Sequence, residues 1–105
     1  MPRILKRAAT KRDLVQHYVY LAENAGLETA ERFLRQAEES FSDLARHPAM
    51  GAQLTLLRRE MVGIRRWQVK GFEKFLIFYL PRRDGVSIVR VLNAAQDWWS
   101  VLGLV

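Results

Sequence analysis

Residues 63–92 read GIRRWQVKGFEKFLIFYLPRRDGVSIVRVL, and this stretch decides the fold. It holds three runs rich in β-branched and aromatic residues, at 64–70, 72–80 and 86–92. Turn residues separate the runs: Lys70-Gly71 lies at the junction of the first and second runs, and residues 81–85 lie between the second and third. The stretch therefore predicts a three-strand antiparallel β-meander over about 64–92.

The middle run of the meander is apolar on both of its alternating faces. Residues 75–80 read FLIFYL. A strand of this kind is usually covered on both sides, and we expect helices on one of them. The tail at 93–105, which contains Trp98 and Trp99, is one candidate for the other side, and a partner protein is the second.

Two helices are predicted before the meander. Apolar residues recur every three or four positions over 14–25 and again over 30–45, where acidic residues occupy the opposite face. Gly26 suits a left-handed stop between the two helices. Because the connection is short, the segment at about 11–46 is predicted to form an antiparallel helical hairpin.

The start of the chain adds two local predictions. Thr10 and Asp13 have the spacing of a capping pair that starts the first helix. Arg3-Ile4-Leu5 is expected to add a short strand at the sheet edge. Together the elements predict one α+β domain over 1–105 with the order β-α-α-β-β-β, in which the helical hairpin packs on a small antiparallel sheet.

Composition restricts the chemistry of the protein. The chain has 105 residues, 50% of them hydrophobic and 27% charged, as expected of a single globular domain. The absence of cysteine excludes disulfides, a thiol nucleophile and cysteine-ligated metals. With two histidines, a metal site built from the protein alone is not expected, and we expect no cofactor.

The charge points to an anionic partner. The net charge is +6, and the excess lies in residues 1–12 and 58–90, because residues 13–46 hold more acids than bases. Such a balance suits nucleic acid, an acidic protein or a membrane surface. No apolar run approaches the roughly 18 residues of a membrane span, and a cytoplasmic location is expected.

Basic and aromatic residues are interleaved along the meander. One interpretation is a surface that binds nucleic acid by phosphate contacts and stacking. The other is the solvated side of a half-buried sheet whose aromatic residues face the core. No Ser-His-Asp set, carboxylate pair or glycine-rich phosphate loop is evident. The candidates for an RNA-cleaving site are Arg66, Tyr79 and Arg90.

Motifs ordered along nearly the whole chain resemble the ParE-type toxins of the RelE/ParE superfamily. In the helical half they are Ala30-x-x-Phe33 and Phe41-x-x-Leu44-Ala45-x-x-Pro48-x-Met50-Gly51. In the meander they are Gly63-Ile-Arg-Arg-Trp67, Leu76-Ile-Phe-Tyr79 and Asp84-Gly85-Val-x-Ile88-x-Arg90. The resemblance implies the toxin of a type II toxin-antitoxin system of the plasmid-stabilisation kind, which a cognate antitoxin neutralises.

The resemblance also implies a target. Toxins of the ParE branch are understood to inhibit DNA gyrase, and so replication, without catalysing a bond change. The RelE branch cleaves mRNA in the ribosome, which makes an endoribonuclease the alternative. Asn93 stands where many relatives carry a histidine, and Gln96 where ParE-like relatives carry an arginine. Because RNA cleavage needs a proton-transfer group, Asn93 favours the gyrase-directed branch.

The implied antitoxin has an acidic, amphipathic C-terminal part, which we expect to cover an apolar groove and to pair with arginines. The residues predicted to bind it are Arg65, Arg66, Trp67, Phe78, Leu80, Arg82, Arg83, Arg90 and Trp98. The residues predicted to contact the target are Lys70, Lys74 and Trp99. Neither membrane binding nor sequence-specific DNA binding by this chain alone is expected, although a plain nucleic-acid-binding module is a third interpretation.

Overall fold

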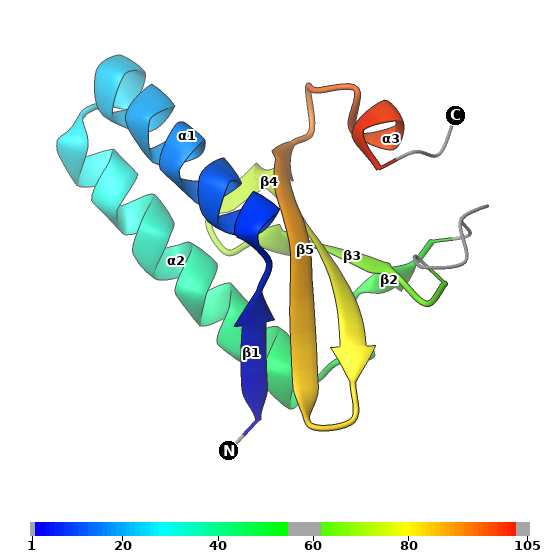
Figure 1. Cartoon of the computed structure of the whole chain (residues 1–105). Helices are drawn as coiled ribbons and strands as arrows, with labels where there is room; N and C mark the ends of the chain where they lie inside the picture. The colour runs from blue at the N-terminus through cyan, green and yellow to red at the C-terminus, as the bar shows by residue number, and fades with distance from the viewer. Residues whose placement is uncertain (1, 55–61, 103–105) are drawn as a thin grey trace.

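The computed structural model describes residues 2–54 and 62–102. Within them the chain forms a sheet, a helical hairpin and a short C-terminal helix (Figure 1). The elements in order are β1 (Arg3–Lys6), α1 (Ala8–Ala25), α2 (Leu27–Arg46), β2 (Ala52–Gln53), β3 (Arg65–Val69), β4 (Phe72–Arg82), β5 (Gly85–Asn93) and α3 (Trp98–Val101). The predicted α+β order is confirmed, with β2 and α3 as additions.

The sheet has the strand order β1-β5-β4-β3-β2. Strands β3, β4 and β5 form the predicted antiparallel meander. The predicted edge strand is present as β1, but it pairs with β5 in parallel, so the sheet is mixed. The two-residue strand β2 pairs with β3 at the opposite edge and is too short to show a period in the sequence.

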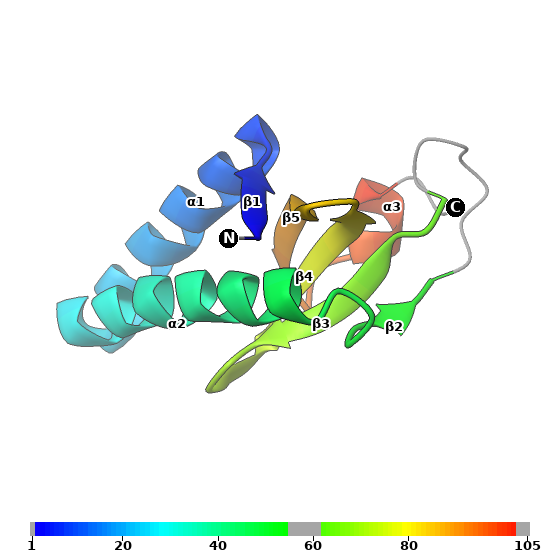
Figure 2. The ribbon, with the colours of Figure 1, turned by 90° about the horizontal axis from the view of Figure 1, so that it is seen from below.

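The helical hairpin covers one face of the sheet (Figure 2). The apolar face of α2 is fully buried at Phe33, Phe41 and Leu44. Gly26 separates the helices with a φ of 98°, a left-handed conformation that glycine adopts without steric cost. No helix in the described parts of the chain is both long and apolar enough to cross a membrane.

Strand β4 is buried on both faces, as predicted. Phe75, Ile77 and Tyr79 pack against the hairpin. Leu76 and Phe78 point to the other face, where the tail around α3 covers them. Among the described residues, Trp98 and Leu102 of the tail therefore cover part of the second face, and Leu54 and Ile64 pack there as well.

Candidate functional site

Helix α1 protects the edge of β5 where β1 ends. The Thr10 hydroxyl donates to the Ile88 carbonyl at 2.8 Å, and Asp13 Oδ2 accepts from the Val91 N–H at 3.0 Å. His17 Nε2 donates to the Val91 carbonyl at 2.7 Å. These side chains satisfy backbone groups that a neighbouring strand would otherwise pair. The predicted capping role of Thr10 and Asp13 is wrong, because α1 already begins at Ala8.

Asp13 and Arg90 form a two-bonded ion pair beside this edge. Arg90 Nε lies 2.7 Å from Asp13 Oδ2, and Arg90 Nη2 lies 2.8 Å from Asp13 Oδ1. Asp13 is only 3% exposed. The hydrogen bond from Arg90 to Asp13 raises the pKa of Arg90, and this effect outweighs the opposing effect of its partial burial. Arg90 thus holds α1 on β5 through Nε and Nη2, and its predicted pairing with an antitoxin or with RNA stays a prediction.

Tyr79 also has a structural role, because its hydroxyl bonds to backbone groups within the fold. Its side chain is fully buried. The hydroxyl donates to the Pro48 carbonyl at 2.7 Å and accepts from the Gly51 N–H at 2.8 Å. Burial raises the pKa of Tyr79, and the Gly51 N–H opposes that rise. The phenol therefore anchors the turn after α2 and is not exposed to a substrate.

The three residues predicted for RNA cleavage have different environments in the fold. Tyr79 faces the helices. Arg66 pairs in register with Phe78, which lies on the other face of the sheet. The guanidinium carbon of Arg66 lies 5.7 Å from the ring centre of Trp98 on that face. Arg90 is held by Asp13. Tyr79 therefore lies on the opposite face of the sheet from Arg66, and the role of Arg66, Tyr79 and Arg90 in RNA cleavage stays a prediction.

We expect Tyr79→Phe to lower the free energy of unfolding by about 1–3 kcal/mol, because the Pro48 carbonyl and the Gly51 N–H lose their partner. The raised pKa of Tyr79 also means that the unfolded chain releases the phenol proton first. Stability should therefore fall as the pH rises through and above the ordinary value of 10.0, and Tyr79→Phe should remove that part of the fall. Urea unfolding at about pH 8 and pH 10.5 measures both effects. Equal stability of the two proteins at both pH values would contradict this.

The predicted antitoxin groove is divided between the two faces of the sheet. Phe78 is fully buried under Trp98, with their ring centres 5.3 Å apart, and Leu80 packs on the same cluster. Trp67 pairs in register with Ile77 and packs on the helix-facing core. Trp67, Phe78, Leu80 and Trp98 therefore do not line one groove, because Trp67 lies on the opposite face and the chain's own tail covers Phe78.

The predicted arginines also have different environments. Arg65 Nη1 donates to the Gly51 carbonyl at 2.6 Å and to the Ala49 carbonyl at 3.3 Å, so it holds the turn that Tyr79 anchors. Arg82 and Arg83 are exposed at the tip of the β4–β5 hairpin. Among the five predicted arginines, these two present their charge most fully to solvent.

The predicted target contacts are likewise separated. Lys70 Nζ lies 2.7 Å from Glu39 Oε1 and 3.9 Å from Asp43 Oδ2. The bond between Lys70 and Glu39 raises the pKa of Lys70 and lowers the pKa of Glu39. Lys74 is exposed, and Trp99 is 44% exposed on α3. Lys70 is therefore the member of the set that already has partners within the chain.

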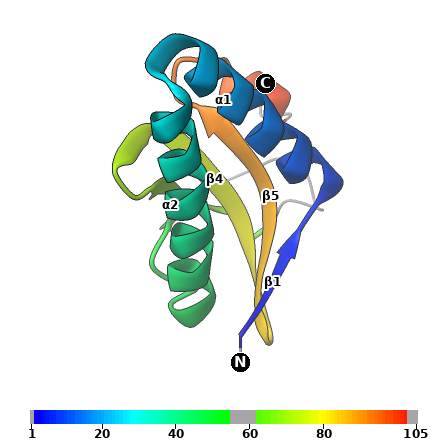
Figure 3. The same ribbon diagram turned by 90° about the vertical axis from the view of Figure 1, so that its left-hand side faces the viewer.

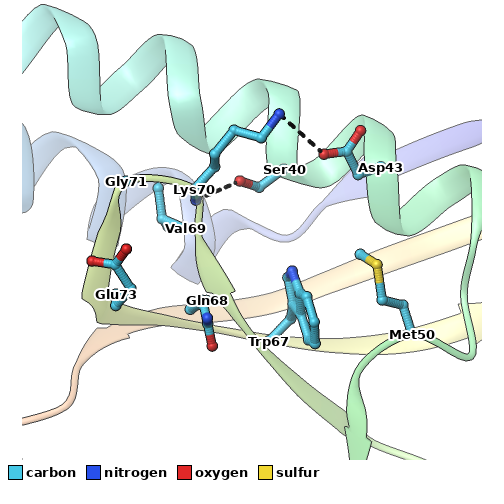
Figure 4. A pocket seen from close by; sticks show the side chains of 9 residues that line it. All are labelled: Ser40, Asp43, Met50, Trp67, Gln68, Val69, Lys70, Gly71 and Glu73. Atoms are coloured by element: carbon cyan, nitrogen blue, oxygen red, sulfur yellow. Dashed lines mark hydrogen bonds and ion pairs between the residues drawn. The ribbon is translucent and has the colours of Figure 1, made fainter.

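Lys70 borders a cavity of about 310 Å³ between α2 and β3. Figure 4 shows its side chain reaching towards Asp43, with Trp67 and Met50 further along the cavity. The Lys70 N–H donates to Ser40 Oγ at 2.9 Å, which ties the β3–β4 turn to α2. In the described residues, no three His, Asp or Glu side chains lie close enough to hold a metal ion.

Asn93 and Gln96 have a role that sequence reasoning missed. The Asn93 N–H donates to Gln96 Oε1 at 2.7 Å, and Asn93 Oδ1 accepts from the Ala95 N–H at 2.9 Å. These bonds form a tight turn that directs α3 onto the sheet. The signal in the sequence was an asparagine directly after a strand, a residue that often bonds to the backbone two positions later.

Comparisons with known proteins agree with this fold. The family model described as "ParE toxin of type II toxin-antitoxin system, parDE" matches residues 4–98. No curated protein matches the chain in sequence. A chain of the solved structure titled "Chromosomal ParDE TA system from P. aeruginosa" is 17% identical, with a TM-score of 0.70 over 89% of this chain and 96% of that chain. At this identity the structural likeness establishes the fold alone.

Proposed function

The chain belongs to the ParE toxin family of type II toxin-antitoxin systems, and we propose that it inhibits DNA gyrase by binding, without catalysing a reaction itself. Gyrase inhibition and antitoxin binding are the general expectation for this family. By this proposal the protein blocks replication in the cytoplasm until its cognate antitoxin neutralises it.

One observation carries the non-catalytic mode of action. Tyr79 and Arg90 were candidates for RNA cleavage. Both side chains form hydrogen bonds that stabilise the fold. The phenol is fully buried, and the guanidinium uses Nε and Nη2 on a buried carboxylate. A general acid or base must reach the proton that it transfers. A toxin built in this way acts through its surface.

The surface charge supports an acidic antitoxin. The protein carries a net charge of +6, and exposed basic residues lie at both ends of the fold, including Arg82, Arg83 and Lys74. An acidic partner would associate rapidly with such a surface and neutralise it. Arg82 and Arg83 remain proposed antitoxin contacts, and Lys74 and Trp99 remain proposed target contacts.

A supercoiling assay with purified gyrase tests the proposal. We expect the toxin to block the supercoiling of relaxed plasmid and to accumulate cleaved DNA, and prior incubation with the antitoxin should prevent both. Heat-unfolded toxin is the control for non-specific binding of a basic chain to DNA. Unimpaired supercoiling at a toxin excess over gyrase would contradict the proposal.

A further inference from the structure

Four arginines lie at the end of the sheet where the chain begins. Strand β1 pairs with β5 so that Arg3 stands beside Gly85, and Gly85 also pairs with Arg82 in the β4–β5 hairpin. Arg83 follows in the turn of this hairpin, and Arg7 directly follows β1. Figure 3 shows the N-terminus and the tip of the β4–β5 hairpin at the same end of the fold. We name Arg3, Arg7, Arg82 and Arg83 the arginine cluster.

Three of these side chains share the sheet face that lies away from the helical hairpin. Leu80 packs on the cluster of that face, and Arg82 follows two positions later on the same strand. Arg3 lies beside Arg82 in the register across β5, so it points the same way. Arg7 Nε donates to Ser87 Oγ at 3.3 Å, and Ser87 pairs in register with Leu80. The arginines of β1 and β4 therefore form one continuous charged surface.

Most of this charge is uncompensated. Within the described parts of the chain, the acid that contacts the arginine cluster is Asp84, whose Oδ2 lies 3.7 Å from Arg3 Nη1. The side chains of this pair are 78% and 59% exposed, and exposed pairs contribute little to stability. None of the other three arginines forms an ion pair with a described residue. Four arginines and one aspartate leave the cluster with a net charge of +3.

A hollow of about 280 Å³ brings part of the arginine cluster together. It is lined by Arg3, Leu5, Arg82, Asp84 and Val86. Two guanidinium groups from different strands thus border the same concave surface. An anionic group that enters the hollow would meet both of them.

The surroundings of the arginines favour a partner that offers charge without apolar surface. Among the residues that line the hollow, Leu5 is the one exposed apolar side chain, at 53%. An amphipathic helix binds through apolar residues repeated along several turns. A phosphate backbone needs no apolar surface, because its charge and its oxygen acceptors supply the binding.

The shape of the arginine cluster favours a duplex over a single strand. Single-stranded nucleic acid is usually held by aromatic side chains on which its bases stack, and none of the residues that line the hollow is aromatic. The extended chain from Arg3 to Arg7 covers roughly 13 Å, at about 3.3 Å per residue. Double-stranded DNA carries one charge per about 1.7 Å of its axis, so this length faces several phosphates. The planar guanidinium of arginine also binds phosphate through two parallel bonds.

We propose that the arginine cluster binds the phosphate backbone of double-stranded DNA, whatever the DNA sequence. Phosphate contacts position a protein on the duplex but do not read its bases. The toxin then contacts the DNA on which its proposed target acts, as well as the target itself. Only this link to gyrase rests on the proposed function, since the contact with duplex DNA does not require gyrase.

Fluorescence anisotropy of a labelled duplex of about 30 base pairs, roughly three helical turns, tests the inference. Arg82→Gln with Arg83→Gln alters the arginine cluster at two exposed positions. The matched control is Arg32→Gln with Arg35→Gln, which removes the same charge from exposed positions of α2. Arg3→Gln tests the cluster from β1. Circular dichroism confirms that each variant is folded, and each is titrated at about 50 mM and about 200 mM salt.

We expect the wild type to bind the duplex with strong salt dependence. The Arg82 and Arg83 variant should lose about tenfold or more in affinity at the lower salt, and its slope of log affinity against log salt should shrink by about two. Arg3→Gln should reduce the slope by about one. The α2 control should stay within about threefold of the wild type, and two duplexes of unrelated sequence should bind equally well.

Equal losses in the two double variants would overturn the inference, because binding would then reflect net charge alone. Absence of saturable binding by the wild type at about 100 µM and the lower salt would overturn it too. Tighter binding of single-stranded RNA than of the duplex would assign the arginine cluster to RNA. Loss of affinity for the purified antitoxin, with DNA binding unchanged, would assign it to an acidic protein. Both of these assignments also overturn the inference.

The supercoiling assay separates this inference from the proposed function. Gyrase inhibition by a toxin that does not bind the duplex would overturn the inference and leave the proposed function standing. Duplex binding through the arginine cluster, without any effect on gyrase, would support the inference and contradict the proposed function.

Discussion

Asp13→Ala is expected to lower the free energy of unfolding by about 3–5 kcal/mol, since it leaves the partly buried Arg90 without its counter-charge. The change also removes the acceptor of the Val91 N–H at the uncovered part of the β5 edge. For a domain of this size the melting temperature should fall by roughly 12 °C or more. Urea and thermal unfolding followed by circular dichroism measure the loss.

Two controls separate the charge from the hydrogen bonds. Asp13→Asn keeps the shape and an acceptor for the Val91 N–H, so its loss should be smaller. Asp13→Leu combined with Arg90→Met removes both charges and should be more stable than Asp13→Ala, because no unpaired charge remains. If Asp13→Ala loses less than about 1 kcal/mol, the ion pair does not hold α1 on the sheet.

Gly85→Ala is expected to detach β1 from the sheet. A Cβ at this position would lie 1.9 Å from the carbonyl oxygen of Arg3 and 2.6 Å from its nitrogen. Backbone atoms of a paired strand cannot move aside as the end of a flexible side chain can. We expect a loss of about 3 kcal/mol, at the upper end of overpacking costs, together with faster amide exchange at Arg3 and Arg7, which donate to Asp84 and Ile88.

Gly26→Ala is the matched control for this prediction. Gly26 also has a positive φ, of 98°, but nothing lies within 4 Å of a Cβ built on it. Its cost should be the strain of this glycine-favouring backbone conformation alone, about 1–3 kcal/mol, with normal exchange at Arg3 and Arg7. Slow exchange at these two amides in Gly85→Ala would contradict the account of how β1 is held.

Local patterns were sufficient to predict most of the fold. The turn residues at Lys70-Gly71 and the doubly apolar run at 75–80 defined the meander, and Gly26 defined the hairpin stop. The parallel pairing of β1 was beyond local reasoning, because its partner lies about eighty residues away in the chain. Thr10 and Asp13 were misassigned because a cap and an edge contact use the same residue types at the same helical spacing.

The candidate site was less predictable for a physical reason. Whether an arginine side chain is available to a partner protein depends on the groups near it in the fold. Asp13, which binds Arg90, lies 77 positions earlier in the chain, so a local sequence pattern does not show the pair. The faces of Trp67 and Phe78 depend on the register of β3 against β4, which carries an irregularity at Gln68/Val69. Arg3 and Arg82 were visible in the sequence, but only the fold shows that they lie side by side across β5 at one end of the sheet.

We propose that this toxin stops replication by binding and does not cleave RNA. Pulse incorporation of labelled thymidine and of labelled amino acids, taken minutes after the toxin is induced alone in bacteria, tests it most directly. We expect thymidine incorporation to fall first while amino-acid incorporation continues. An early fall in amino-acid incorporation with sustained thymidine incorporation would contradict it and would favour a ribosome-dependent nuclease.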